Sequence, residues 1–285
     1  MKNPKIMYIL ISIFCVFAVI AGIYAQFFDE DHGGVNLAET ENVSNPENVD
    51  DGGEESQTEL RARFNDLFTN TINLGGYDTT GIQKITNEEE IVYSVVDYQQ
   101  NTDRYELDLN IPLINIRNDV ANALNSATQT TFINKANEII GDTESTVKTI
   151  YSIDYVAYVN DGILSLVIKS TLKEGSSAQR IMVQTYNYNL TTNTEVTLTD
   201  LATIKMLNRD EVNNKINQVV SEANQESQTL QSMGYNEIYV RDMQSDMYSI
   251  DNAGAYFLGP DKALYIVYAY GNSEFTSVMD IVLFE

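Results

Sequence analysis

The amino-acid sequence predicts an α+β fold, an antiparallel sheet with helices packed on one side, preceded by one N-terminal transmembrane helix. Three observations predict this fold. An uncharged apolar stretch near the N-terminus is long enough to cross a bilayer, segments with alternating apolar residues follow it, and segments with helical spacing and capping residues lie between them. The chain has 285 residues and 43% of them are apolar, which is enough for a sizeable folded region.

The apolar stretch covers residues 6–28, IMYILISIFCVFAVIAGIYAQFF, and carries no charge. As a helix it would be about 34 Å long at about 1.5 Å per residue, and a hydrocarbon core is about 30 Å thick. Lys2 and Lys5 precede it, whereas the residues after it are acidic. The positive-inside rule therefore predicts a transmembrane anchor with residues 1–5 as a short cytoplasmic tail and the rest of the chain outside the cytoplasm.

A cleaved signal peptide is the alternative interpretation of this stretch, with Ala25 as the cleavage point. Ile23-Tyr24-Ala25 is a poor small-x-small site, and the apolar run is longer than a typical signal core of about 7–15 residues. We therefore expect an uncleaved, single-pass protein of the cell membrane. Both interpretations place the folded region outside the cytoplasm.

The net charge of −24 is distributed unevenly along the chain. Residues 1–28 carry +2, residues 29–58 carry −10, and the remaining 227 residues carry −16. Residues 29–58 have no apolar periodicity, which predicts an acidic, disordered linker. Nucleic acid is excluded as an expected partner because phosphate binding needs clustered Lys and Arg, and a basic protein suits this acidic domain better.

The single cysteine and the single histidine exclude several kinds of site. Cys15 lies in the predicted anchor, and His32 lies in the linker, which has no rigid pocket for a general base. Disulfides, Ser-His-Asp and Cys-His nucleophiles and the common zinc sites are therefore excluded. We expect no metal, no cofactor and no catalytic residue, with a hydrolase built on two carboxylates as the alternative.

The folded region is predicted to cover residues 59–285, with an internal division considered near residue 175. Its helices are expected to begin at capping boxes, Ser56-x-x-Glu59 and Asn208-x-x-Glu211. Asn160-Asp161-Gly162 predicts a tight hairpin turn because these residue types tolerate positive φ. The expected elements, in order, are a helix from 56 to 75, strands over 90–98 and 104–116, a helix over 117–140, strands over 149–159, 163–173 and 180–190, a short helical or turn segment from Thr199 or Asp200, a helix over 208–234, and strands over 247–258, 263–271 and 278–285.

Aromatic residues on the later strands are the candidate partner-binding surface. Such rings are enriched at protein interfaces and could also hold a glycan. The alternative is that they pack on the sheet with their hydroxyl groups at its rim. The candidates are Tyr186, Tyr188, Tyr256, Phe257, Tyr265, Tyr268 and Tyr270.

Three segments carry a resemblance to a known family. They are YELDLNIPLINIRNDVANALNSATQTTFI, YNYNLTTNTEVTLTDL and AYFLGPDKALYIVYAYGNSEFTSVMDIVLFE. In this order, over about residues 91–285, they resemble the extracytoplasmic domain shared by the RsiV-type anti-sigma factors and the PdaC-type peptidoglycan deacetylases. The resemblance implies an extracytoplasmic envelope module, which in the sensors binds lysozyme and in the deacetylases accompanies a separate catalytic domain.

The chain departs from this family in three respects. About five residues precede the predicted anchor, where the sensors have a sigma-binding domain, and no deacetylase segment with metal-binding histidines follows. A Gly-Gly-Ala-His turn of the family is replaced by EGSSAQR. We therefore expect a non-enzymatic binding module of the cell envelope that recognises a cell-wall glycan or a basic, lysozyme-like protein. A carboxylate-based wall hydrolase and a structural subunit of an envelope complex are the alternatives.

Overall fold

The computed structural model describes residues 55–235, 238–272 and 276–285. Residues Glu54–Glu285 form one compact unit. The predicted cytoplasmic tail, the anchor and residues 29–54 of the predicted linker lie outside the described residues. Within the described ranges, no helix is both long enough and apolar enough to cross a membrane.

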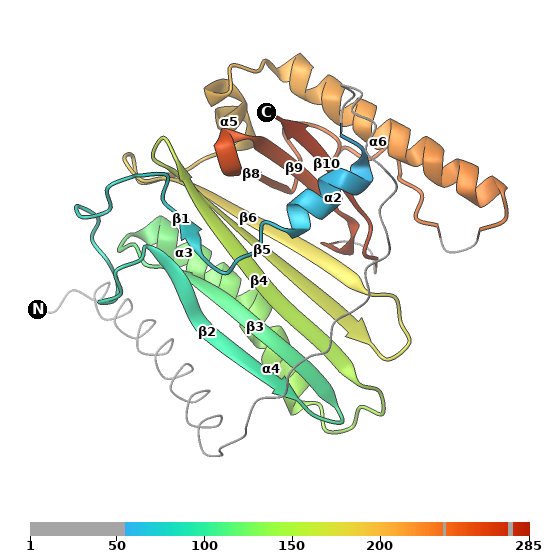
Figure 1. The fold of residues 1–285 in the computed structure, drawn as a ribbon, viewed down its shortest axis with the longest axis horizontal. Coiled ribbons are helices and arrows are strands. Elements are labelled where there is room, and N and C mark those ends of the chain that lie inside the picture. The colour runs from blue at the N-terminus through green and yellow to red at the C-terminus, as the bar shows by residue number, and fades with distance from the viewer. Residues whose placement is uncertain (1–54, 236–237, 273–275) are drawn as a thin grey trace, which may run out of the picture. The chain divides into compact units, whose positions relative to one another are not determined.

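The structure is a mixed α+β fold with two sheets (Figure 1). In the larger sheet the strand order is β2-β3-β4-β5-β6-β7, with β1 beside β4, and in the smaller sheet it is β10-β9-β8. The helices are α2 (Gln57–Asn65), α3 (Asp119–Thr128), α4 (Asn134–Gly141), α5 (Leu198–Ile204) and α6 (Arg209–Ser232). The strands are β1 (Ile72–Asn73), β2 (Val92–Asn101), β3 (Tyr105–Ile114), β4 (Thr149–Asn160), β5 (Ile163–Glu174), β6 (Arg180–Asn189), β7 (Thr194–Glu195), β8 (Ala255–Leu258), β9 (Leu264–Ala269) and β10 (Met279–Phe284).

The prediction of a single antiparallel sheet with helices on one side needs correction. Most strand pairs are antiparallel, but β3 and β1 each pair with β4 in parallel. The helical segment between β3 and β4 makes the β3–β4 pair parallel, because it returns the chain to the starting end of β3. Helices also lie on two sides, with α3 and α4 against the larger sheet and α5 and α6 against the smaller sheet (Figure 1).

The smaller sheet lies between two apolar clusters. On one face, Leu264, Ile266 and Val282 pack against α5 and α6. On the other face, Tyr265 and Ile281 share a cluster with α2 and with residues of β4, β5 and β6. The smaller sheet and α2 therefore cover part of one face of the larger sheet, and α3 and α4 lie on its opposite face.

Local sequence signals predicted many of these elements correctly. The turn between β4 and β5 has positive φ at Asp161 and Gly162, as the Asn-Asp-Gly sequence indicates. Both predicted capping boxes are present, at Ser56 and at Asn208. The helix expected over residues 117–140 is formed by α3 and α4, joined without a break by a π-helical turn.

Two predicted elements are shorter than expected. The first helix ends at Asn65, and Ile72, within the range expected for this helix, instead belongs to strand β1 beside β4. The chain turns between them at Asn70, which has a positive φ. The side-chain oxygen of Asn70 accepts a hydrogen bond from the backbone N–H of Tyr155 on β4. The strand expected over residues 247–258 forms only over Ala255–Leu258.

Pro112 lies inside β3 and not at its end. A proline has no N–H to donate, so it is rarely tolerated within a sheet. The pairing of β3 with β4 extends only to Leu109, and the pairing with β2 is irregular beside Pro112, between Ser94 and Val96. The proline therefore lies where the regular ladder is already interrupted.

Candidate functional site

Five of the seven predicted aromatic site residues lie in the protein interior. They pack on the strands as the alternative interpretation describes, and each is at most 1% exposed. Their hydroxyl groups do not all reach the rim, since those of Tyr265 and Tyr268 are buried. The five are Tyr188, Phe257, Tyr265, Tyr268 and Tyr270.

The other two predicted residues, Tyr186 and Tyr256, are half-buried and lie on different sheets. Tyr186 on β6 donates a hydrogen bond to Gln184 at 3.2 Å. Burial and the negative charge of Glu195 raise the pKa of Tyr256 on β8. The seven side chains therefore do not form one exposed aromatic surface, and a role of Tyr186 or Tyr256 in partner binding stays a prediction.

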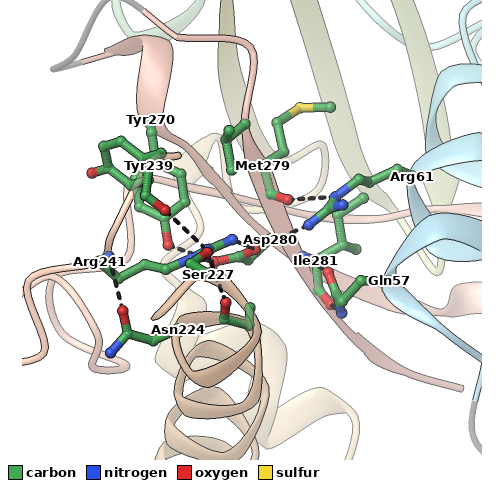
Figure 2. Close-up of polar contacts among 12 residues, drawn as sticks. Gln57, Arg61, Asn224, Ser227, Tyr239, Arg241, Tyr270, Met279, Asp280 and Ile281 are labelled. Atoms are coloured by element: carbon green, nitrogen blue, oxygen red, sulfur yellow. Dashed lines mark hydrogen bonds and ion pairs between the residues drawn. The ribbon is translucent and has the colours of Figure 1, made fainter. Parts of the chain in front are cut away.

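A buried ion pair that the sequence analysis missed connects the segment after α6 to the smaller sheet (Figure 2). Arg241 donates two hydrogen bonds to the Asp280 carboxylate on β10, at 2.7 and 2.8 Å. The side chains are 4% and 0% exposed. The remaining Arg241 donors reach Ser227 and the Ala223 carbonyl oxygen on α6, so the guanidinium is surrounded by acceptors.

Two more side chains complete this centre. Tyr270 donates to Asp280 at 2.7 Å, and Arg61 of α2 approaches the same carboxylate at 3.3 Å (Figure 2). Burial and the adjacent Asp280 charge raise the pKa of the Tyr270 hydroxyl far above its usual range. Arg241 and Asp280, at the middle of this centre, are almost fully buried, so we assign the centre a structural role. Its one sequence signal was Asp280 itself, a charge within the apolar run VMDIVLF.

The candidate functional site lies on the part of the larger sheet that the smaller sheet and α2 leave open. Along β3, Leu107 and Leu109 are buried, whereas Asp108 between them is exposed on the opposite face, as the strand pleat requires. The pairing register places Asp97 of β2 opposite Asn110 of β3, and residue 108 opposite residue 152 of β4. Carboxylates from β2, β3 and β4 therefore share this face.

Side-chain amides hold two of these carboxylates in place. The Asn110 amide lies 3.5 Å from Asp108 Oδ1 and 3.4 Å from Asp154 Oδ1, so the separation of the two oxygens cannot exceed the sum of these distances. Gln99 donates to Asp108 at 3.1 Å, and Asn70 donates to Asp154 at 2.9 Å. These neutral donors orient the carboxylates without removing their negative charge.

Burial and the neighbouring carboxylates both disfavour the charged form of Asp108. Partial burial raises its pKa, and the nearby charges of Asp154, Asp97 and Glu106 raise it further, against the hydrogen bond from Gln99. Glu106 forms an ion pair with Lys148 at 3.1 Å. Among the described residues, the salt bridges do not include Asp97, Asp108 or Asp154.

One lysine borders the three carboxylates. Lys169 of β5 lies opposite Asp154 in the register, but its ammonium group donates to Asn65 at 3.1 Å and lies 4.3 Å from the ring centre of Phe68. Burial lowers the pKa of Lys169, whereas the negative charge of Asp154 acts in the opposite direction. The loop after α2 thus keeps this cation at the border of the carboxylate group.

Within the described residues, no group of three or more His, Cys, Asp or Glu side chains is arranged to hold a metal ion. The three aspartates instead form an extended negative surface over three neighbouring strands. The sequence analysis did not identify them. The alternation of Glu106, Asp108 and Asn110 was visible in the sequence, but nothing local indicated that the described helices and the smaller sheet would leave this face exposed.

Comparisons with known proteins give distant fold similarities. No protein-family model matches the chain, and no curated protein sequence matches it. Solved structures that resemble it include a DUF3298 family protein from Pseudomonas aeruginosa PAO1, at 13% identity and a TM-score of 0.37, covering 64% of this chain and 82% of that one. Another is a DUF3298 family member from Bacteroides fragilis, at 12% identity and a TM-score of 0.37, covering 66% and 85%.

Proposed function

We propose that this protein is a membrane-anchored, extracytoplasmic binding module of the cell envelope, of the RsiV/PdaC type, that recognises a basic wall-acting protein such as lysozyme. The observation that carries the proposal is the open sheet face with Asp97, Asp108 and Asp154, whose charges no salt bridge among the described residues neutralises. The predicted anchor and the sequence resemblance support the location and the type of module.

The mechanism of recognition follows from electrostatic complementarity. Lys and Arg side chains of a partner would lie over the three aspartates and relieve the repulsion that raises the pKa of Asp108. The excess negative charge of the whole chain would also attract a basic partner from a distance. Binding of this kind weakens with salt because mobile ions screen the attraction between exposed charges that are more than about 10 Å apart at 0.1 M.

Calorimetric titration of the full chain in a mild detergent with lysozyme tests the proposal. The double variant Asp97→Asn, Asp108→Asn removes two charges from the open face. The matched control Asp242→Asn, Asp246→Asn removes two exposed charges from the loop before β8. We expect micromolar or tighter binding that weakens with salt, a loss of about tenfold or more in the first variant, and little change in the control.

Each other result has a definite meaning. Absence of binding at low and at moderate salt would exclude lysozyme as the partner. Equal loss in the two double variants would show that net charge alone drives binding and would exclude the open face as the site.

A second candidate function is a carboxylate-based hydrolase acting on wall glycan. Glycosidases use two carboxyl groups separated by about 5–9 Å, and the general acid needs a raised pKa. Asp108 has a raised pKa, and the Asn110 amide lies within 3.5 Å of one carboxylate oxygen of Asp108 and one of Asp154, so the two carboxyl groups are close neighbours. Release of reducing sugar from peptidoglycan by the full chain, lost in Asp108→Asn and in Asp154→Asn but retained in Asp246→Asn, would support this candidate. No release by the unmodified chain would exclude it.

A further inference from the structure

The two sheets have four outer edges, and three of them are closed by hydrogen bonds from other elements. At β10, the side-chain amide of Gln57 on α2 pairs with the backbone of Ile281, donating at 2.8 Å and accepting at 2.9 Å. Arg61, one turn later, donates to the carbonyl oxygen of Met279 at 2.7 Å (Figure 2). The helix thus occupies the position that another strand would take.

The edge of β8 is closed by side chains of the larger sheet. Thr185 accepts the N–H of Tyr256 at 3.0 Å, and Ser165 accepts the N–H of Leu258 at 3.1 Å. Asn187 donates to the carbonyl oxygen of Tyr256 at 2.8 Å. No strand can join β8 without breaking these bonds.

The outer edge of β6 is closed in the same way. Asn272 both donates to and accepts from the backbone of Val183, at 3.0 Å in each case. The N–H of Val196 bonds to the Asn187 carbonyl oxygen at 2.9 Å, and β7 pairs with the end of the strand. Unprotected strand edges promote unwanted pairing, which accounts for such closures.

Strand β2 forms the fourth edge, and it differs from the other three. Among the strands of the described residues, β3 is its one partner, and Figure 1 shows β2 as the outer strand of the larger sheet. A register shift between Ser94 and Val96 distorts its first half, whereas pairing with β3 is regular from Val96 to Asn101. This regular half is the part suited to pairing with a further strand.

The side chains of this half differ between the two faces of the sheet. Val96 and Tyr98 lie opposite buried residues of β3 and are half-buried. Asp97 and Gln99 are exposed on the open face, in line with Asn110 and Asp108 of β3. An added strand would therefore meet apolar groups on one face and negative charge on the other.

We propose that the Val96–Asn101 edge of β2 binds an extended basic segment of a partner protein, which adds a strand to the larger sheet. The segment would alternate Lys or Arg, placed toward Asp97 and the open face, with apolar residues that pack beside Val96 on the other face. This inference rests on the proposed function, since it specifies how a basic partner engages the acidic face. Charge complementarity favours such a segment over a second copy of this chain, because Glu88, Glu89, Glu90 and Asp97 would repel their own copies.

The test uses the full chain in a mild detergent and the peptide acetyl-Lys-Val-Lys-Val-Lys-Val-Lys-amide. The control peptide has the same sequence and charge but is N-methylated at its five central residues, so these residues cannot donate backbone hydrogen bonds to β2. We expect the unmethylated peptide to bind about tenfold or more tightly than the methylated one. Asp97→Asn is expected to weaken its binding severalfold, and Asp246→Asn, on a distant exposed loop, is expected to leave it unchanged.

Equal affinity for the two peptides would overturn the edge proposal and leave the acidic-face proposal standing. Lysozyme binding without any peptide binding would likewise reject only the edge, whereas absence of both would reject the two proposals together. Sedimentation showing a dimer of the chain that the peptide dissociates would assign the edge to a second copy and overturn the assignment to a partner.

Discussion

At the scale of single residues, Asp280 shows how a charge can be kept in the protein interior. Its carboxylate is fully buried and contacts Arg241, Tyr270 and Arg61. Burying an ion costs several kcal/mol, about as much as its partners return, so the pair as a whole adds little net stability. Removing one partner is different, because the other then remains buried with its charge unpaired.

We therefore expect Asp280→Leu to lower the free energy of unfolding by about 3–5 kcal/mol. The double variant Asp280→Leu, Arg241→Met should recover much of this loss because it removes both charges. Urea denaturation followed by circular dichroism measures both changes. A loss below about 1 kcal/mol in the single variant would mean that Arg241 finds another partner or water.

Removal of the Asp108 charge is expected to raise the stability of the protein, whereas removal of Asp280 lowers it. Burial and neighbouring carboxylates raise its folded-state pKa, so its ionised form destabilises the fold above that pKa and the cost disappears once it is protonated. Asp108→Asn should thus stabilise the protein at pH 7, by no more than about 0.5 kcal/mol at this exposed site. The gain should vanish below the unfolded-state pKa of about 3.9.

Thermal unfolding of Asp108→Asn at pH 7 and pH 3 measures this effect, with Asp246→Asn as the control away from the sheet. A variant that is more stable yet binds a basic partner more weakly would identify Asp108 as a functional residue, since function then conflicts with stability. Destabilisation at pH 7 would instead show that the hydrogen bonds of the carboxylate with Gln99 and Asn110 outweigh the repulsion.

At the scale of elements, α2 serves as the missing neighbour of an edge strand. Leu60 and Phe64 bury its apolar side in the core shared by the two sheets, and Gln57 supplies the backbone-like hydrogen bonds to Ile281. The helix begins at Gln57, directly after the capping residue Ser56. The capping box therefore fixes Gln57 as the first residue of the helix. The helix belongs to the folded unit, although residues 57 and 58 were expected to end the linker.

Gln57→Ala should therefore lower the free energy of unfolding by about 1–3 kcal/mol, since it leaves the N–H and C=O of Ile281 without partners. Alanine favours the helix itself, so a loss must come from the strand edge. The matched control is Thr58→Ala, at an exposed position of the same helix, which should change stability by less than about 0.5 kcal/mol. Equal effects in the two variants, measured by urea denaturation, would reject the edge-closing role.

At the scale of the whole molecule, the excess of negative charge influences both stability and recognition. The chain carries 41 acidic and 17 basic residues, and its calculated isoelectric point is about 4.2. Self-repulsion of this kind opposes the compact state, and salt screens it. The same charge favours a basic partner, so salt should affect folding and binding in opposite directions.

We expect the Tm of the full chain at pH 7 to rise by about 2 °C or more between low salt and about 0.15 M sodium chloride. Near the isoelectric point, where net repulsion is small, the increase should disappear. Differential scanning calorimetry at the two pH values measures this difference. A Tm that falls with salt at pH 7 would show that attractive ion pairs dominate over the net repulsion.

The sequence by itself determined the features that depend on neighbouring residues. The capping boxes join residues three positions apart, the hairpin turn needs only Asp161 and Gly162, and the alternation along β3 follows from the pleat. Each is set by the local backbone, so each could be predicted without knowing what lies across the fold.

Only the tertiary structure decided the division into two sheets, the buried Arg241–Asp280 pair and the open acidic face. Arg241 and Asp280 lie 39 residues apart, and Asn70 and Asp154 lie 84 residues apart. Such contacts depend on which surfaces cover one another, and alternation alone does not say whether a polar face will be covered. For the same physical reason Phe257, Tyr265, Tyr268 and Tyr270, which were expected on the surface, lie in the core, because apolar clusters cover both faces of the smaller sheet.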